Sequence, residues 1–182
     1  LADRDARSAE IGPALATWTA PLFPGEPPAA ARLRVAACLV ADTAWREHPE
    51  TRARDAFFGL AHYPFLGLDH AERAFLAYAV FCRYEGRRDD PAVARIAGLL
   101  EKAQRRRAEA REAGRAGGVG GTGGVAAVLR ACPVAIAGGT LRLRTDHPAV
   151  DPADEAIRGR LDTLVACLGL DRAELTSEPA PA

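Results

Sequence analysis

The sequence contains no methionine, one lysine (Lys102) and two serines, Ser8 and Ser177. Both serines lie in terminal regions and neither stands in a G-x-S-x-G motif, so nothing predicts a serine nucleophile. The lack of methionine and the helical character of the chain from Leu1 onward lead us to expect an excised domain whose upstream partner is missing.

A disulfide framework and a membrane segment are missing as well. The cysteines form no C-x-x-C pair and each lies in an apolar segment, which predicts buried thiols in a reducing compartment: Cys38, Cys82, Cys132 and Cys167. No apolar run approaches membrane-spanning length, and there is no signal peptide. We therefore expect a cytoplasmic protein that does not bind membranes.

Neither sign of charge is in excess. The 24 basic residues balance the 24 acidic ones, so no global field predicts binding to nucleic acid or to a membrane. Nearly all the basic residues are arginines, whose planar guanidinium suits phosphate better than an ammonium group does. A hydrophobic content of 48% and a length of 182 residues predict one globular domain, with or without an appendage.

The first part of the chain predicts a mainly α fold. Asp69 and Glu72 have the spacing of a capping box, Pro49 suits a first helical position, and Gly86 suits a helix stop. Four successive helical patterns predict a helical bundle: 32–44, 49–63, 68–86 and 89–114.

The chain changes character at 114–124, where seven of the eleven residues are glycine, so we expect a flexible linker there. Gly118, Gly120 and Gly123 match G-x-G-x-x-G. A dinucleotide-binding loop needs a preceding strand, however, and here a charged helix precedes it.

Beyond the linker the sequence predicts a small α/β appendage, made of a hairpin and a helix. Gly138-Gly139 predicts a type I′ turn, followed by alternating leucines and arginines over 141–144. Asp151-Pro152 is expected to cap a helix that Gly169 closes. The predicted domains are thus a helical domain (1–113), the linker (114–124), the appendage (125–176) and a disordered tail (177–182).

One hypothesis for the polar residues is an active metal-dependent phosphohydrolase. It requires several ligands to converge on one point: Asp42, His48, His62, Asp69 and His70. Ala41, directly before Asp42, has no ligand atom, so an adjacent His-Asp dyad is lacking. The ligand count therefore favours helix caps and ordinary surface or core histidines.

The other hypothesis is a polyanion-binding groove. Arginines and histidines are concentrated in one segment: Arg46, His48, Arg52, Arg54, His62, Arg73, Arg83, Arg87 and Arg88. Facing one groove, they would bind phosphate through charge-assisted, bidentate contacts. The alternative is a solvated helix surface that also carries Glu47, Glu50, Glu72 and Glu85, and residue types alone do not decide between the two.

Three segments in order resemble the C-terminal region of exopolyphosphatase / guanosine-pentaphosphatase (Ppx/GppA) proteins of the alphaproteobacterial type: "WTAPLF" (18–23), "RLRVAACLVADTAW" (32–45) and 46–86. The most specific parts are Asp42-Trp45-His48-Pro49 and the run from His62 through Gly67-x-Asp69-His70 to Arg73-Ala74-Phe75. The resemblance covers about residues 10–100. Residues 151–170 look like the family's closing helix, whereas 101–130 depart from the pattern.

The resemblance implies that catalysis belongs to two N-terminal actin-like domains, absent here, which hold Mg²⁺ and phosphate. This chain would then contain no catalytic residue, metal ligand or cofactor. Its helical domain would resemble a degenerate His-Asp (HD) phosphohydrolase, with Asp42 as the surviving Asp and Ala41 in the place of a metal-binding His.

The expected function is therefore that of a non-catalytic C-terminal domain, which contributes polyanion binding and homodimer contacts. Its partners would be its own N-terminal domains and polyphosphate or guanosine pentaphosphate, between which the sequence does not choose, and no nucleic acid. The candidate binding residues are Arg46, His48, Arg52, His62, His70, Arg73 and Arg83. The alternatives are an active HD-type phosphohydrolase and a pure dimerisation module.

Overall fold

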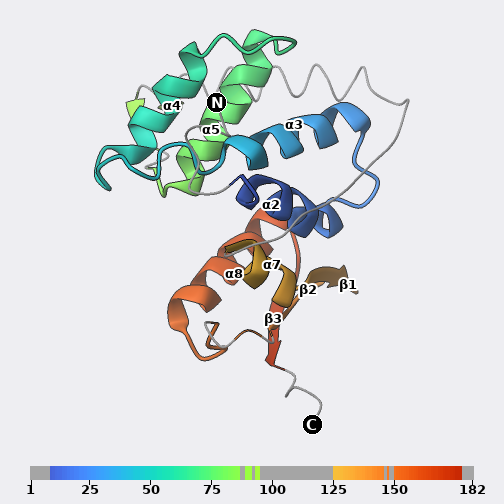
Figure 1. Cartoon of the computed structure of the whole chain (residues 1–182). Helices are drawn as coiled ribbons and strands as arrows, with labels where there is room; N and C mark the ends of the chain where they lie inside the picture. The colour runs from blue at the N-terminus through green and yellow to red at the C-terminus, as the bar shows by residue number, and fades with distance from the viewer. Residues whose placement is uncertain are drawn as a thin grey trace. The chain divides into compact units, whose positions relative to one another are not determined.

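The structure is a computed structural model, and it describes residues 9–86, 89–91, 93–94, 125–145, 147 and 150–177. The chain forms two compact units. The first comprises 1–13 and 25–119, the second 14–24 and 120–182, and α2 (Ile11–Thr19) begins in the first and ends in the second. The described elements are mainly helical, with one small sheet near the C-terminus, as predicted (Figure 1). None of the described helices is long and apolar enough to cross a membrane.

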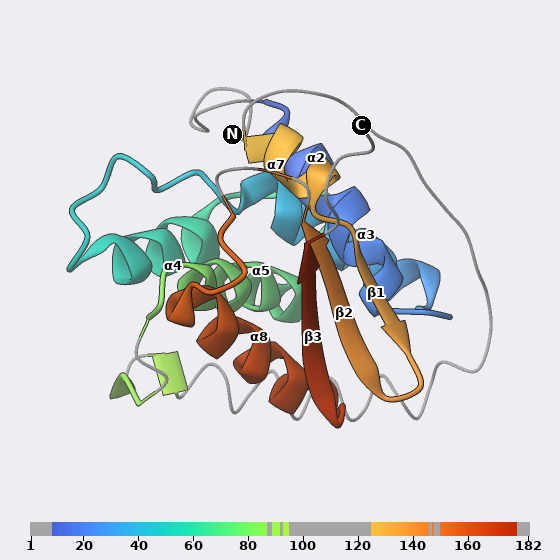
Figure 2. The ribbon, with the colours of Figure 1, turned by 90° about the horizontal axis from the view of Figure 1, so that it is seen from below.

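The described part of the first unit includes the helices α3 (Pro28–Val40), α4 (Arg52–His62) and α5 (His70–Arg83), of which α4 and α5 lie side by side (Figures 1 and 2). Phe57 of α4 and Phe81 of α5 are almost completely buried, and their rings meet edge to face with centroids 5.9 Å apart. Val93 is buried in the same cluster. The core of this unit therefore lies between α4 and α5.

The helix boundaries correct the sequence-based ones in two places. α3 ends at Val40, so Asp42 lies in the turn after a helix rather than inside one. Pro49 also lies in a turn, because α4 begins only at Arg52. The amides of Thr51 and Arg52 both donate to the carbonyl of His48, at 3.0 and 2.8 Å, which starts the helix after the proline.

The predicted capping box at the start of α5 is confirmed. The Glu72 amide donates to Asp69 Oδ1 at 2.8 Å, and the Asp69 amide donates to Glu72 Oε2 at 3.0 Å. These two bonds satisfy two of the amides that a helix N-terminus leaves without partners.

The end of α5 differs from the prediction, because the left-handed residue is Glu85 (φ 59°) and not Gly86. The Glu85 amide donates to the Cys82 carbonyl, and the Gly86 amide donates to the Phe81 carbonyl at 2.9 Å. This is the bonding pattern of a Schellman motif. Position 86 requires glycine for a steric reason and not for a left-handed backbone, since a Cβ there would lie 2.4 Å from the Phe81 ring.

From residue 125 on, the described residues of the second unit form two helices and a three-stranded sheet: α7 (Val125–Ala131), β1 (Val134–Ala137), β2 (Thr140–Thr145), α8 (Glu155–Leu168) and β3 (Arg172–Ser177). Strands β1 and β2 form the predicted hairpin, and the positive φ of both Gly138 and Gly139 confirms a turn of the I′ kind. The helix α8 is capped by Asp154 rather than by Asp151, and Gly169 closes it with φ 65°, as predicted.

Strand β3 was not predicted. It pairs in parallel with β2, which makes the order β1-β2-β3 (Figure 2). Its sequence, RAELTS, alternates only weakly, and its pairing depends on the crossover through α8 rather than on a local turn. β3 ends at Ser177, with which the expected disordered tail was to begin, and 178–182 lie outside the described residues.

The core of the second unit includes residues that precede the first unit's main helices. Leu22, in the 3₁₀ helix η1 (Ala20–Leu22), is buried with Leu141 of β2 and Leu161 of α8. The indole Nε1 of Trp18 donates to the Cys132 carbonyl at 2.6 Å. The hairpin and helix thus complete their core with a third strand and with 14–24.

Of the predicted helix 89–114, only Pro91, Val93 and Ala94 are described as helical. The rest of that helix after Ala94 and the glycine-rich linker 114–124 lie outside the described residues.

Candidate functional site

Three of the singled-out residues, Asp42, Arg52 and Arg83, converge on Tyr84. Arg52 is the first residue of α4, Arg83 is the last residue of α5, and Tyr84 follows it directly. The guanidinium carbons of Arg52 and Arg83 lie 5.5 and 5.3 Å from the centroid of the Tyr84 ring. Both distances fall within the range of a cation–π contact. We call these four residues the Tyr84 cluster.

Asp42 is the buried member of the Tyr84 cluster. It is only 2% exposed, and its Oδ1 lies 3.7 Å from Nη2 of Arg83, whose side chain is 42% exposed. A buried carboxylate requires such a counter-charge, and a cation at the end of α5 also interacts favourably with the helix dipole. Asp42 therefore positions Arg83 at the surface.

Arg52 is held from two sides. Its Nε and Nη2 donate to the Glu47 carbonyl at 3.0 and 2.9 Å, while its guanidinium also approaches the Tyr84 ring. A guanidinium has five donors, so this geometry fixes the side chain without using all of them.

Tyr84 itself remains a neutral phenol at physiological pH. Its partial burial raises the pKa of the phenol, and the negative charge of Asp42 raises it further. Arg83, Arg52 and the Ala44 backbone act in the opposite direction but are outweighed. The guanidinium groups of Arg52 and Arg83 thus lie over an uncharged ring.

Arg46 and His48 lie on the turn that leads into α4. The Arg46 guanidinium stacks on the Trp45 ring at 4.9 Å, and His48 Nδ1 accepts a hydrogen bond from the Glu50 amide at 3.4 Å. Both residues are exposed. Since the His48 carbonyl begins α4, His48 lies one turn before Arg52.

The other candidates lie elsewhere on the first unit. His62 stacks on Phe58 near the end of α4, with ring centroids 6.3 Å apart. His70 begins α5, and Arg73 precedes Arg83 by ten residues, or about 15 Å along the helix axis. The structure therefore brings Arg52 and Arg83 together at Tyr84 and places His62, His70 and Arg73 elsewhere. Arg87 and Arg88 lie outside the described residues.

Two residues of these polar clusters were missed by the sequence analysis. Tyr84 could have been noticed as an aromatic residue directly after an arginine in an arginine-rich segment. Nothing in the sequence marks Arg32 as a contact residue, because it is an ordinary polar residue on an otherwise apolar helix.

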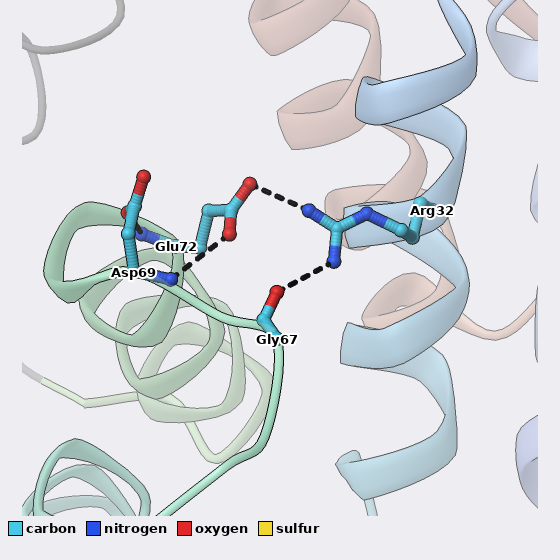
Figure 3. Close-up of polar contacts among 4 residues, drawn as sticks. All are labelled: Arg32, Gly67, Asp69 and Glu72. Carbon is cyan, nitrogen blue, oxygen red and sulfur yellow. Dashed lines mark hydrogen bonds and ion pairs between the residues drawn. The ribbon is translucent and has the colours of Figure 1, made fainter.

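Arg32 links α3 to the start of α5 (Figure 3). Its Nη2 donates to Glu72 Oε1 at 2.6 Å, and its Nη1 donates to the Gly67 carbonyl at 3.3 Å. The other carboxylate oxygen of Glu72 serves the capping box at Asp69, so one buried side chain joins two helices and a loop. This arrangement is structural and exposes little of the carboxylate.

The ligand set of the metal-site hypothesis is not brought together. Asp42 and His48 lie on the turn before α4, His62 ends α4, and Asp69 and His70 begin α5. Within the described ranges, no three side chains of His, Cys, Asp or Glu are close enough to hold one metal ion.

In a comparison with protein families, residues 1–169 match the family described as "Exopolyphosphatase, C-terminal". The match includes the Tyr84 cluster, the hairpin and α8. Among curated proteins, none matches the chain significantly. Because the family match covers most of the 182 residues, the chain belongs to the family of exopolyphosphatase C-terminal domains.

Proposed function

We propose that this chain is a non-catalytic C-terminal domain that binds polyphosphate or guanosine pentaphosphate for an exopolyphosphatase and also contributes dimer contacts. The chemistry, with its Mg²⁺, would belong to N-terminal actin-like domains of the parent enzyme. Arg52 and Arg83 are the primary phosphate contacts, and Arg46 and His48 extend the surface. The observation that carries the proposal is the convergence of Arg52 and Arg83, from two helices, on one neutral ring.

The geometry supports local recognition of phosphate oxygens. The Tyr84 ring and the Glu47 carbonyl hold Arg52, and Asp42 holds Arg83, so little side-chain entropy is lost when a phosphate binds. Exposed Glu47 and Glu85 share this surface, so no broad positive field attracts the ligand. We therefore expect weak binding with marked salt dependence.

The test is calorimetric titration of the chain with polyphosphate at low salt, comparing the wild type with an Arg52→Gln/Arg83→Gln variant. We expect the variant to lose about tenfold or more in affinity, since each charge-assisted contact contributes about 1.5–3 kcal/mol. Arg158→Gln is the matched control, because this exposed arginine lies on α8 in the second unit. An assay that detects millimolar affinity and finds no binding at low salt would leave only the structural role.

The HD-like ancestry is part of the same proposal. It is supported by the burial of Asp42, whose carboxylate faces Arg83 rather than a metal-ligand partner, and by Ala41 in the preceding position. Metal analysis of the purified chain separates this proposal from an active phosphohydrolase. Divalent transition metal bound in stoichiometric amount would favour the active enzyme.

An apolar surface supports the dimer contacts. Leu66, in the loop between α4 and α5, is 99% exposed, and Phe58 and Tyr63 are each 36% exposed. The Tyr63 and Phe65 rings pack 4.7 Å apart next to Leu66. Exposed apolar side chains on one loop and the helix before it can form the centre of a contact surface when a partner covers them.

Light scattering tests this surface. Leu66→Asp should shift the chain from dimer to monomer, and Leu66→Met, which keeps the apolar character, should not. A wild-type chain that is monomeric at high concentration would refute the dimer contacts. A dimer whose polyphosphate affinity is unchanged in the Arg52→Gln/Arg83→Gln variant would indicate a pure dimerisation module.

A further inference from the structure

The sheet of the second unit has one face that none of the described helices of that unit covers. Leu141 and Leu143 of β2 are buried in the same cluster as Leu161 and Val165 of α8. Side chains alternate along a strand, so Arg142 and Arg144 point to the opposite face, where both are exposed.

Two arginines on this face converge on one carboxylate. Arg142 lies directly opposite Glu174 in the β2–β3 register, and its Nε is 3.1 Å from Glu174 Oε2. Arg172 donates to the other oxygen, Oε1, through Nε at 3.2 Å and Nη2 at 3.0 Å. The Arg142 and Arg172 side chains remain 57% and 68% exposed, so their other donors face solvent.

The balance of charge on the face is positive. On the described strands, the basic residues of this face are Arg142, Arg144 and Arg172, and the acidic residue is Glu174. On β1, the neighbouring strand, Ala135 and Ala137 are exposed and small, so no bulky side chain projects beside Arg142. The hydrogen bond from Arg142, followed by that from Arg172, holds the pKa of Glu174 below its usual range, as a carboxylate among cations requires.

From this arrangement we infer that the exposed face of the sheet is a second polyphosphate-contact surface, in which Glu174 occupies the position that a phosphate oxygen takes when the chain binds. The inference rests on the proposed function for the identity of the ligand, but it uses none of the residues of the Tyr84 cluster.

The strands also argue against a nucleic acid as the ligand. Proteins that bind single strands stack the bases on aromatic side chains, and the strands β1, β2 and β3 contain no aromatic residue. A ligand made only of repeating phosphates needs no stacking surface. Polyphosphate therefore fits this face better than single-stranded RNA or DNA does.

Glu174 competes with the ligand for the two arginines. Removing Glu174 should therefore raise the affinity for polyphosphate, whereas removing a purely structural salt bridge would not. Glu174→Gln removes the internal anion and leaves Arg142 and Arg172 for phosphate, so affinity should rise, by up to about fivefold for an exposed ion pair. Arg142→Gln/Arg172→Gln should lower it. Glu155→Gln, which removes the same charge from the first turn of α8, is the matched control.

The experiment is an NMR titration of the full chain with tripolyphosphate at low salt, following the Nε signals of Arg52, Arg142 and Arg172. We expect the Arg142 and Arg172 signals to shift even in the Arg52→Gln/Arg83→Gln variant, and the apparent affinity at these signals to rise in Glu174→Gln but not in Glu155→Gln.

The two proposals fail in different ways. Shifts at Arg52 without shifts at Arg142 and Arg172 would overturn the sheet surface and leave the Tyr84 cluster standing. Shifts at the sheet alone would support the inference and overturn the Tyr84 cluster. An oligonucleotide of matched charge that binds the sheet more tightly, through the same arginines, would overturn the assignment to polyphosphate.

Discussion

At the scale of single residues, Glu85 stands out because it adopts a left-handed conformation, φ 59°, without being glycine. A side chain at such a position costs about 1–2 kcal/mol, which glycine avoids. Strained residues of this kind persist where the surroundings hold them, often beside a functional site. Glu85 directly follows Tyr84, so the turn that strains it also orients Arg83 and Tyr84.

Replacing Glu85 by Gly should therefore stabilise the chain. We expect a gain of about 0.5–1 kcal/mol in the free energy of unfolding, because the relief of strain exceeds the entropy that glycine adds to the unfolded chain. Urea denaturation measures the gain. Glu85→Ala is the control, since it removes the same charge and keeps the strain. An equal gain in both variants would attribute the effect to charge and contradict the conformational argument.

The raised pKa of Tyr84 predicts that the stability of the chain depends on pH. Its pKa is raised in the folded chain, chiefly by burial, so the folded state binds the phenolic proton more tightly than the unfolded state does. The resulting contribution to stability is complete below the ordinary phenol pKa of about 10 and is lost as pH rises through the raised value. Ultraviolet titration should show a phenolate that forms late and that is absent from Tyr84→Phe. Its persistence in Tyr84→Phe would contradict the assignment.

At the scale of the elements, the buried carboxylate of Glu72 links helices α3 and α5. Glu72 serves the capping box of α5 and also accepts from Arg32 of α3 (Figure 3). The side chain of Glu72 is 8% exposed, whereas that of Arg32 is 49% exposed. Loss of the contact would therefore destabilise the fold mainly because the Glu72 carboxylate would stay buried without its cation.

Arg32→Ala should lower the free energy of unfolding by about 1–3 kcal/mol, the usual cost of leaving a buried polar group with fewer partners. Arg32→Lys should recover only part of it, because an ammonium does not reach the Gly67 carbonyl and Glu72 with the same fork. Arg54→Ala is the control, since its pair with Asp90 is more exposed and contributes less than about 1 kcal/mol. Equal losses in Arg32→Ala and Arg54→Ala would refute the role of Glu72.

At the scale of the whole molecule, the chain builds two cores, and the second draws on residues far apart in sequence. Leu22 is 5% exposed and packs with the hairpin and α8, and Trp18 bonds to Cys132 across 114 positions. The first core, between α4 and α5, contains neither residue. The two units should therefore respond separately to the loss of core side chains.

Leu22→Ala should cost about 2–4 kcal/mol and should act on the second unit. Amide hydrogen exchange should show weaker protection in β1, β2 and β3 and unchanged protection in α4 and α5. Val80→Ala, in the first core, is the reciprocal variant and should have the opposite pattern. Uniform loss of protection in either variant would show that the chain unfolds as one cooperative body.

The sequence by itself determined the features that depend on neighbours a few positions apart. The capping box of Asp69 and Glu72, the turn at Gly138-Gly139 and the helix stop at Gly169 all follow from local backbone and side-chain chemistry. Arg52, Arg83 and Asp42 could also be selected as candidates, because residue type alone shows which side chains bind phosphate or carry charge.

Only the tertiary structure decided which of these residues meet. Tyr84 brings Arg52 and Arg83 together, Arg32 reaches Glu72 across 40 positions, and β3 pairs with β2 only after α8 has returned the chain to the sheet. Each of these contacts joins segments that have no periodic relation in the sequence. Their partners are chosen by the packing of whole helices and strands, and local propensity does not encode that packing.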